Sequence, residues 1–215
     1  MKYVADSVQN PFGLDLPCRE GVPGFGNPNA DFHLIGNHPG IHGGTETRIP
    51  FTEMPWSERF FEALADGGLL TSPDIDAVTD KSRVFFSYIH PCLPQSSETE
   101  PAVEEYEAME SFFDAELRAV TAHILFPVGK QATAHVLKTC TPRQVDTVDM
   151  DNLHATEIRG SGWLVVPIQE PANWTETDRT ALVKTLTTLL ARDYRQISDL
   201  SRFLGGGDPY SYMTR

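Results

Sequence analysis

Short apolar segments alternate along the chain with longer amphipathic segments, and this alternation constrains the fold more than any other feature. Apolar residues in the longer segments recur at the spacing of a helix face. The predicted strands are FHLIG (32–36), SRVFFSYIH (82–90), AHILFPVG (122–129) and GWLVVPI (162–168). The predicted helices cover residues 55–70, 101–120, 130–140 and 176–194. Strands that alternate with helices of this length predict an α/β sandwich with a mostly parallel sheet.

The length of the chain predicts one domain. A chain of 215 residues can bury one substantial core, and no interior linker divides it. We predict a single domain over residues 1–215, with an irregular, Pro- and Gly-rich lead-in over 1–30 and a flexible tail over 205–215. No run of about 18 apolar residues occurs, and the N-terminal stretch MKYVADSVQN lacks an apolar signal core. We therefore expect a cytoplasmic monomer that spans no membrane.

The charge balance of the protein limits its electrostatic attraction to nucleic acid. The sequence has 30 acidic and 17 basic residues, which gives a net charge of −13. Such a surface repels nucleic acid in dilute buffer. It suits a cytoplasm with molar salt, where the Debye length is about 3 Å and the self-repulsion is screened. The charge therefore favours adaptation to high salt, and an ordinary acidic protein is the alternative.

The cysteines do not form a disulfide framework in the sequence. Cys18, Cys92 and Cys140 are few, scattered and without a CxxC pair. Three reduced thiols are the simplest prediction.

Three histidines precede or follow the first predicted turn, but a metal site is not favoured. His33, His38 and His42 are separated by five and four positions, and His33 lies inside a strand. No carboxylate or cysteine stands at a familiar ligand spacing, so we predict no metal. The sequence also lacks a GxSxG nucleophile elbow, a GxGxxG fingerprint that opens a helix, and a GxxxxGK[ST] phosphate loop.

The turn GNHPG, directly after the first strand, has the composition of a binding loop. Gly36 and Gly40 let the backbone approach a ligand closely, and Pro39 stiffens the turn. Asn37 and His38 can each hold a water molecule or a carbonyl oxygen. Ligands of parallel sheets bind at the carboxyl ends of the strands, where this turn is expected. The alternative is an ordinary turn, because Asn and Gly are common turn residues.

Five stretches, in this order, resemble the uracil-DNA glycosylase superfamily, most closely its family 4 and related archaeal forms. They are GVPGFGNPNADFHLIGNHPG, RIPFTEMPWSERFFEAL, RVFFSYIHPCLP, ELRAVTAHILFPVGKQATAHVL and WLVVPIQEPANW. The resemblance covers roughly residues 18 to 190. It implies a three-layer α/β/α sandwich with a central four-stranded, mainly parallel sheet. This agrees with the fold that the alternation predicts.

The resemblance implies a DNA glycosylase that excises uracil or another deaminated base by hydrolysing the N-glycosidic bond. The turn after the first strand would hold the extruded base and the attacking water. Catalytic roles carry over to Asn37, His38 and Glu170, and substrate-binding roles to Gly36, Pro39, Gly40, Phe51, Ser87 and Tyr88. Phe51 stands at the position that stacks on uracil, although a packed core phenylalanine is the alternative. DNA containing a deaminated base is the expected partner.

The chain departs from the family at several positions. Tyr88 replaces the asparagine that reads the uracil edge, and Glu170 replaces the histidine that stabilises the departing base. Family 4 also binds an iron–sulfur cluster through four cysteines. Cys92 and Cys18 match at most two ligand positions, so we expect no cluster. These departures leave a second hypothesis open, in which a catalytically lapsed protein binds a nucleobase, a nucleotide or single-stranded nucleic acid.

Contact with DNA phosphates requires local basic groups, even on an acidic protein. The candidates are Arg48, Lys138, Arg143 and Arg159. Ordinary solvated surface residues are the alternative for all four.

Overall fold

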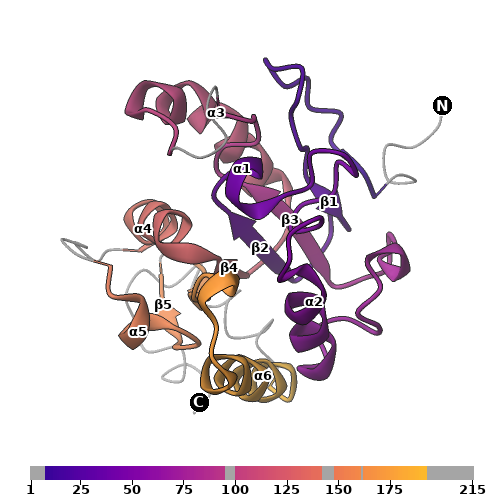
Figure 1. Cartoon of the computed structure of the whole chain (residues 1–215), viewed down its shortest axis with the longest axis vertical. Coiled ribbons are helices and arrows are strands. Elements are labelled where there is room, and N and C mark those ends of the chain that lie inside the picture. Colours follow the sequence, from indigo (N-terminus) through magenta and orange to yellow (C-terminus); the bar gives the residue numbers. More distant parts are fainter. Residues whose placement is uncertain (1–7, 95–99, 142–147, 161, 193–215) are drawn as a thin grey trace, which may run out of the picture.

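A six-stranded sheet with the order β1-β3-β2-β4-β6-β5 forms the centre of the protein (Figure 1). The computed structural model describes residues 8–94, 100–141, 148–160 and 162–192. The strands are β1 (Phe25–Gly26), β2 (Phe32–Gly36), β3 (Val84–Tyr88), β4 (Ile124–Pro127), β5 (Ile158–Arg159) and β6 (Leu164–Val165). The helices are α1 (Pro39–His42), α2 (Ser57–Asp66), α3 (Val103–Ala119), α4 (Gly129–Cys140), α5 (Met150–Leu153) and α6 (Glu176–Leu190), with 3₁₀ turns at Ile75–Ala77 and Pro171–Asn173.

The four central strands are parallel, as the alternation of strands and helices predicts. β3, β2, β4 and β6 pair side by side in the same direction. Gly36 at the end of β2 lies opposite Tyr88 at the end of β3, and Ile35 lies opposite Pro127 at the end of β4. The turns that follow these strands therefore open at one edge of the sheet.

The sheet has six strands where the sequence predicted four. β1 and β5 pair antiparallel with β3 and β6 at the two edges of the sheet. Each contains only two residues, which is too short to show an alternating pattern in the sequence. β1 also lies within the lead-in over 1–30 that was expected to be irregular. The predicted tail over 205–215 lies outside the described residues.

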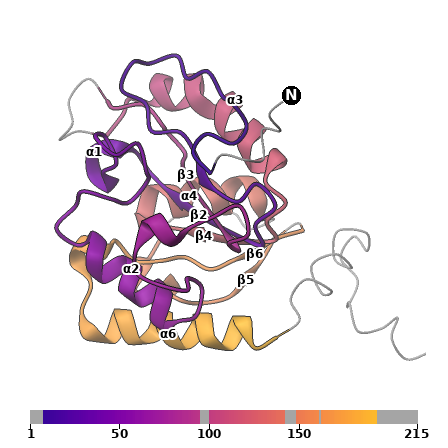
Figure 2. The ribbon, with the colours of Figure 1, turned by 90° about the vertical axis from the view of Figure 1, so that its right-hand side faces the viewer.

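Helices cover both faces of the sheet and produce the predicted three layers. On one face, α2 and α6 pack through Phe60, Leu64, Leu182 and Leu186 against side chains such as Phe86. On the other face, α3 and α4 pack against the alternate side chains of the same strands. Figure 2 shows α6 along one side of the sheet and α3 along the opposite side. The sheet is therefore buried on both faces, which explains why its central strands read as nearly continuous apolar runs.

A disulfide joins Cys18 to Cys92, so the expectation of three reduced thiols is wrong for this pair. The Cα atoms lie 5.9 Å apart, and the bond links positions that are separated by 74 residues in the sequence. The adjoining backbones are also paired, because the N–H of Val22 donates to the carbonyl of Pro91 at 2.8 Å. Cys140 is a free, buried thiol, and burial raises its pKa to about 11. Spacing in the sequence could not show this pairing, because β3 brings the two cysteines together only in the folded chain.

Among the described residues, no helix combines the length and the apolar character that crossing a bilayer requires.

Candidate functional site

A pocket of about 550 Å³ opens at the edge of the sheet where the parallel strands end. Its lining includes Asn37 and His42 after β2, Glu100 before α3, Gly129 after β4, Asp149 before α5, and Glu170 after β6. The segments that follow β2, β4 and β6 lie far apart in the sequence, and the parallel register of the strands brings them together. The location matches the rule that open α/β sheets bind ligands at the carboxyl ends of their strands.

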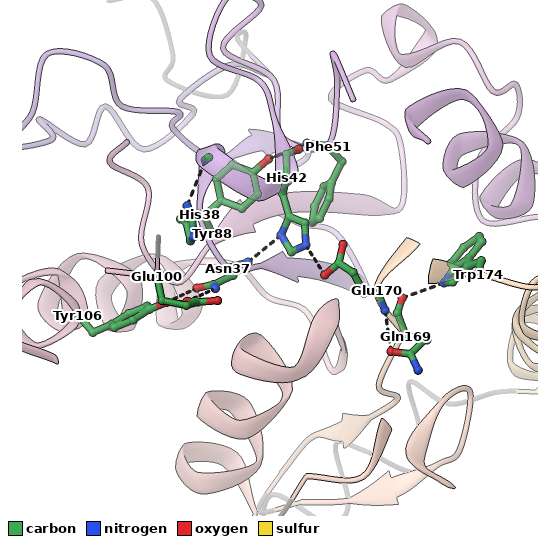
Figure 3. A network of polar contacts seen from close by, with 11 residues as sticks. Asn37, His38, His42, Phe51, Tyr88, Glu100, Tyr106, Gln169, Glu170 and Trp174 are labelled. Carbon is green, nitrogen blue, oxygen red and sulfur yellow. Dashed lines mark hydrogen bonds and ion pairs between the residues drawn. The ribbon is translucent and has the colours of Figure 1, made fainter. Parts of the chain in front are cut away.

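His42 lies at the centre of a polar network in this pocket (Figure 3). The backbone N–H of Asn37 donates to His42 Nδ1 at 2.9 Å, and His42 Nε2 lies 3.1 Å from Glu170 Oε2. Because Nδ1 accepts a hydrogen bond, the ring proton is assigned to Nε2, which donates to the Glu170 carboxylate. The His42 side chain is fully buried, whereas that of Glu170 is 24% exposed. The pair therefore presents one oriented carboxylate to the pocket.

The single turn of α1 positions His42. His38 is the N-cap residue, and its Nδ1 accepts a hydrogen bond from the N–H of Gly40 at 3.1 Å. Pro39 occupies the first helical position, where its missing N–H costs nothing. Gly43 ends the turn with φ of +78°, and a Cβ there would lie 1.9 Å from a carbonyl oxygen. The predicted turn is thus a short helix that aims His42 at Glu170.

His38 itself is completely buried and caps the helix. Its Nε2 has no hydrogen-bond partner among the described residues. Burial is the main reason that its pKa is lowered to about 4. His38 is absent from the residues that line the pocket.

Phe51 and Tyr88 lie directly behind His42. The rings of Phe51 and His42 are 5.4 Å apart, and the Phe51 side chain is fully buried. The Tyr88 hydroxyl accepts from the N–H of Phe51 at 2.8 Å and lies within 3.0 Å of the carbonyls of His42 and Gly43. Burial raises the pKa of Tyr88 well above its usual range. The Tyr88 hydroxyl therefore bonds to the backbone that supports the site. His42 lines the pocket and Phe51 does not, so His42 lies between the Phe51 ring and the pocket.

The side chain of Asn37 belongs to a second polar group in the lining of the pocket. Its Nδ2 donates to Glu100 Oε2 at 2.8 Å, and its Oδ1 accepts from the Tyr106 hydroxyl at 2.6 Å. The Tyr106 hydroxyl also lies 2.7 Å from Glu100 Oε2. The three side chains form a closed triangle, seen at the lower left of Figure 3.

Ser87 faces the other side of the sheet, because successive residues of a strand point in opposite directions. Its hydroxyl lies 2.7 Å from His33 Nε2, and it donates to the buried carboxyl of Glu116. Burial raises the pKa of Glu116 to about 8. The structure therefore separates Ser87 from the pocket that Asn37 and Glu170 line.

The predicted phosphate contacts are not gathered at the pocket. Arg48 is exposed on the loop before Phe51. Lys138 is exposed in the last turn of α4, and Arg159 lies on the edge strand β5, opposite the first residue of β6. Both of these positions lie toward the amino ends of the parallel strands, away from the pocket. Arg143 lies outside the described residues.

The charged residues that do line the pocket were mostly not predicted. Four carboxylates and one lysine contribute to its walls: Glu100, Asp149, Asp151, Glu170 and Lys130. Over the residues that the structure describes, no group of three or more His, Cys, Asp or Glu residues is arranged to hold a metal ion.

The sequence does not predict site roles for His42, Glu100 or Tyr106. The one signal for His42 is its place among three nearby histidines, a pattern that relates to metal binding. Glu100 and Tyr106 stand in an acidic stretch that resembles an ordinary helix start. Asn37 and Glu170 were predicted for the site, and the structure brings both to the pocket wall.

A carboxylate that is held by an imidazole N–H at the wall of a pocket can accept a proton from a bound water molecule. Glu170 and His42 have this arrangement. A water activated in this way is the nucleophile that hydrolysis of a glycosidic bond requires.

Two curated relatives support the resemblance noted in the sequence. A type-5 uracil-DNA glycosylase of Thermus thermophilus is 32% identical over 99 residues, which cover 45% of this chain and 44% of that protein. A type-5 uracil-DNA glycosylase of Pyrobaculum aerophilum is 32% identical over 120 residues, covering 54% of this chain and 52% of that protein. The matches thus span about half the length of these relatives, which carry the type-5 name rather than family 4.

The family model of the Uracil DNA glycosylase superfamily matches residues 23–190, a range that holds every strand and the whole pocket. Together with the three-layer fold, this match shows that the chain belongs to the uracil DNA glycosylase superfamily.

Proposed function

We propose that the protein excises uracil or another deaminated base from DNA by hydrolysing the N-glycosidic bond. The observation that carries this proposal is the contact between His42 and Glu170, which sets an oriented carboxylate in the wall of the pocket. Membership of the superfamily supports the class of reaction. Glu170 stands where the family has a histidine, so in this proposal position 170 supplies the carboxylate base, and the imidazole that orients it is His42 from a different loop.

In the proposed reaction, Glu170 acts as the general base. A water molecule attacks C1′ of the deoxyribose, and its proton passes to the Glu170 carboxylate. The bond between C1′ and the base nitrogen breaks, and its electron pair leaves with the base. His42 holds the carboxylate through its Nε2–H, and Lys130, which also lines the pocket, is available to offset the negative charge on the departing base.

DNA that contains a deaminated base is the proposed substrate, and contacts with the base are expected to dominate binding. With a net charge of −13, the protein gains little from phosphate contacts when molar salt removes the counterion-release term. The cytoplasmic location and the monomeric state stay predictions.

We further propose that this chain works without an iron–sulfur cluster. Its three cysteines cannot supply four thiolates, and two of them are bonded to each other. Cys140, the last residue of α4, is buried in the cluster that contains Ile35 and Leu137. The donor set therefore does not fit the cluster. Iron analysis of protein purified without oxygen tests this proposal, and stoichiometric iron would overturn it.

A binding protein without turnover is the second candidate. It is favoured by the full burial of Phe51 behind His42, because a base cannot stack on that ring while His42 stays in place. It is also favoured by Tyr88, whose hydroxyl is taken up by the backbone instead of facing the pocket.

The deciding experiment measures excision of uracil, hypoxanthine and xanthine from single- and double-stranded DNA at molar KCl. We expect excision of at least one of these bases, and a loss of about 10²–10⁴-fold in kcat for Glu170→Gln. Glu104→Gln is the matched control, because Glu104 is exposed on α3 and does not line the pocket. Binding of the damaged DNA with no excision of any base would reject the enzyme and support the binding protein.

A further inference from the structure

The pocket has a second carboxylate that the proposed reaction leaves without a role. Glu100 lines the same pocket as Glu170 but is supplied by the segment that leads into α3. Most exposed carboxylates are held only by water, whereas Glu100 Oε2 lies within hydrogen-bond distance of two protein side chains. Asn37 Nδ2 donates to it at 2.8 Å, and the Tyr106 hydroxyl, 2.7 Å away, shares its one proton between Glu100 Oε2 and Asn37 Oδ1.

The two donors are themselves fixed by the protein core. Asn37 is 2% exposed, and its backbone carbonyl accepts from the N–H of His90 at 3.0 Å. The ring of Tyr106 packs edge-on against the ring of His90 at 5.6 Å. A bond from the Tyr106 hydroxyl to Asn37 closes the triangle. Glu100 is therefore held in one orientation by groups that cannot easily move, which is the arrangement expected of a preorganised charge.

A fixed negative charge of this kind can stabilise the transition state of the proposed reaction. When the bond between C1′ and the base breaks, the electron pair leaves with the base, and the deoxyribose gains positive charge. Glu170 takes up the proton of the attacking water, which leaves the stabilisation of the sugar open to a second carboxylate. A fixed carboxylate in the same pocket interacts more strongly with the charged transition state than with the neutral substrate.

We propose that Glu100 is a second catalytic carboxylate, which stabilises positive charge on the deoxyribose, and that Asn37 and Tyr106 are the residues that position it. This inference rests on the proposed glycosylase function. It assigns different tasks to the two carboxylates: Glu170 accepts a proton, and Glu100 remains charged throughout the reaction.

The test compares binding of two oligonucleotides, so that its result does not depend on turnover. One carries a pyrrolidine at the abasic position, which is a cation and resembles the charged sugar, and the other carries the uncharged tetrahydrofuran. We expect the wild-type protein to prefer the pyrrolidine. Glu100→Gln should reduce this preference roughly tenfold, as expected for the loss of one charge at a partly exposed site. Tyr106→Phe, which keeps the ring, should reduce it by a smaller factor.

Steady-state kinetics distinguish a variant that misplaces the Glu100 carboxylate from a variant that folds poorly. Glu100→Gln and Tyr106→Phe should lower kcat with little change in KM, because the interaction is made in the transition state. Glu104→Gln is again the control and should match the wild-type protein in both assays.

The outcomes distinguish this inference from the proposed function. Base excision combined with equal binding of both oligonucleotides, or with a Glu100→Gln variant of wild-type kcat, would overturn the role of Glu100 and leave the glycosylase intact. A preference for pyrrolidine that depends on Glu100, in a protein that excises no base, would reject the enzyme but support the charged site.

Discussion

Breaking the disulfide between Cys18 and Cys92 should lower the stability of the protein substantially. The bond closes a loop with a sequence separation of 74 residues. The loop-closure entropy of the unfolded chain for this length corresponds to about 4.5 kcal/mol at 25 °C. Natural domains are stable by only about 5–15 kcal/mol, so the disulfide would supply a large part of the total. For a protein of this size, the expected decrease in Tm is roughly 9–18 °C.

The assay is thermal unfolding followed by circular dichroism, with and without a phosphine reductant, for three proteins. The wild-type protein should lose stability on reduction, whereas the double variant Cys18→Ser/Cys92→Ser should start at the low Tm and stay there. Cys140→Ala, which removes the buried free thiol, should still respond to the reductant. An unreduced, denatured wild-type protein should show one reactive thiol. Three reactive thiols, or an unchanged Tm after complete reduction, would refute the reasoning.

Two other perturbations test the packing around the site, and a third tests a buried carboxyl on the other face of the sheet. Tyr88→Phe removes a hydroxyl that serves buried backbone groups, so the free energy of unfolding measured in urea should fall by about 2 kcal/mol. Gly129→Ala adds a Cβ 2.6 Å from Glu170 Oε2 at a residue with φ of +79°, so activity should fall well beyond any change in stability. The folded-state pKa of Glu116, about 8, lies above its ordinary value of 4.5, so the folded protein binds the extra proton between these values. Its contribution is complete below pH 4.5 and is lost as the pH rises through 8, with a slope of at most about 1.4 kcal/mol per pH unit. Urea titrations from pH 5 to 9 should show this decline in the wild-type protein but not in Glu116→Gln, and equal slopes would contradict the assignment.

The fold could largely be predicted from the sequence, because its central strands are buried on both faces. The segments 82–90 and 122–129 contain nearly continuous apolar runs, as expected of strands in a covered sheet, and β3 and β4 lie inside them. The helix predicted over 130–140 matches α4 closely, because its apolar residues face one layer. The edge strands could not be predicted in the same way, since two residues cannot establish a period and their pairing depends on the neighbouring strand.

The residues of the site could be predicted from the sequence only where a turn has a recognisable composition. Asn37 was found because glycine and proline mark a turn after a strand. The partner of His42 is 128 positions away, and the partner of Asn37 is 63 positions away, so no local pattern links either pair. For Tyr88, the alignment predicted a role that the contacts of its side chain do not match. Its alignment with a base-reading residue says nothing about the backbone groups that its hydroxyl contacts in the folded chain.

The packing around His42 gives the protein a built-in optical reporter. Trp56 touches the imidazole edge-on, with ring centroids 5.9 Å apart, and only 8% of its surface is exposed. The fluorescence of an indole responds to the polarity and quenching groups in contact with it. A ligand that displaces His42 from Phe51 must change the surroundings of Trp56 at the same time. A ligand that moves His42 can therefore be followed in the unlabelled protein, by the intensity and wavelength of its tryptophan emission.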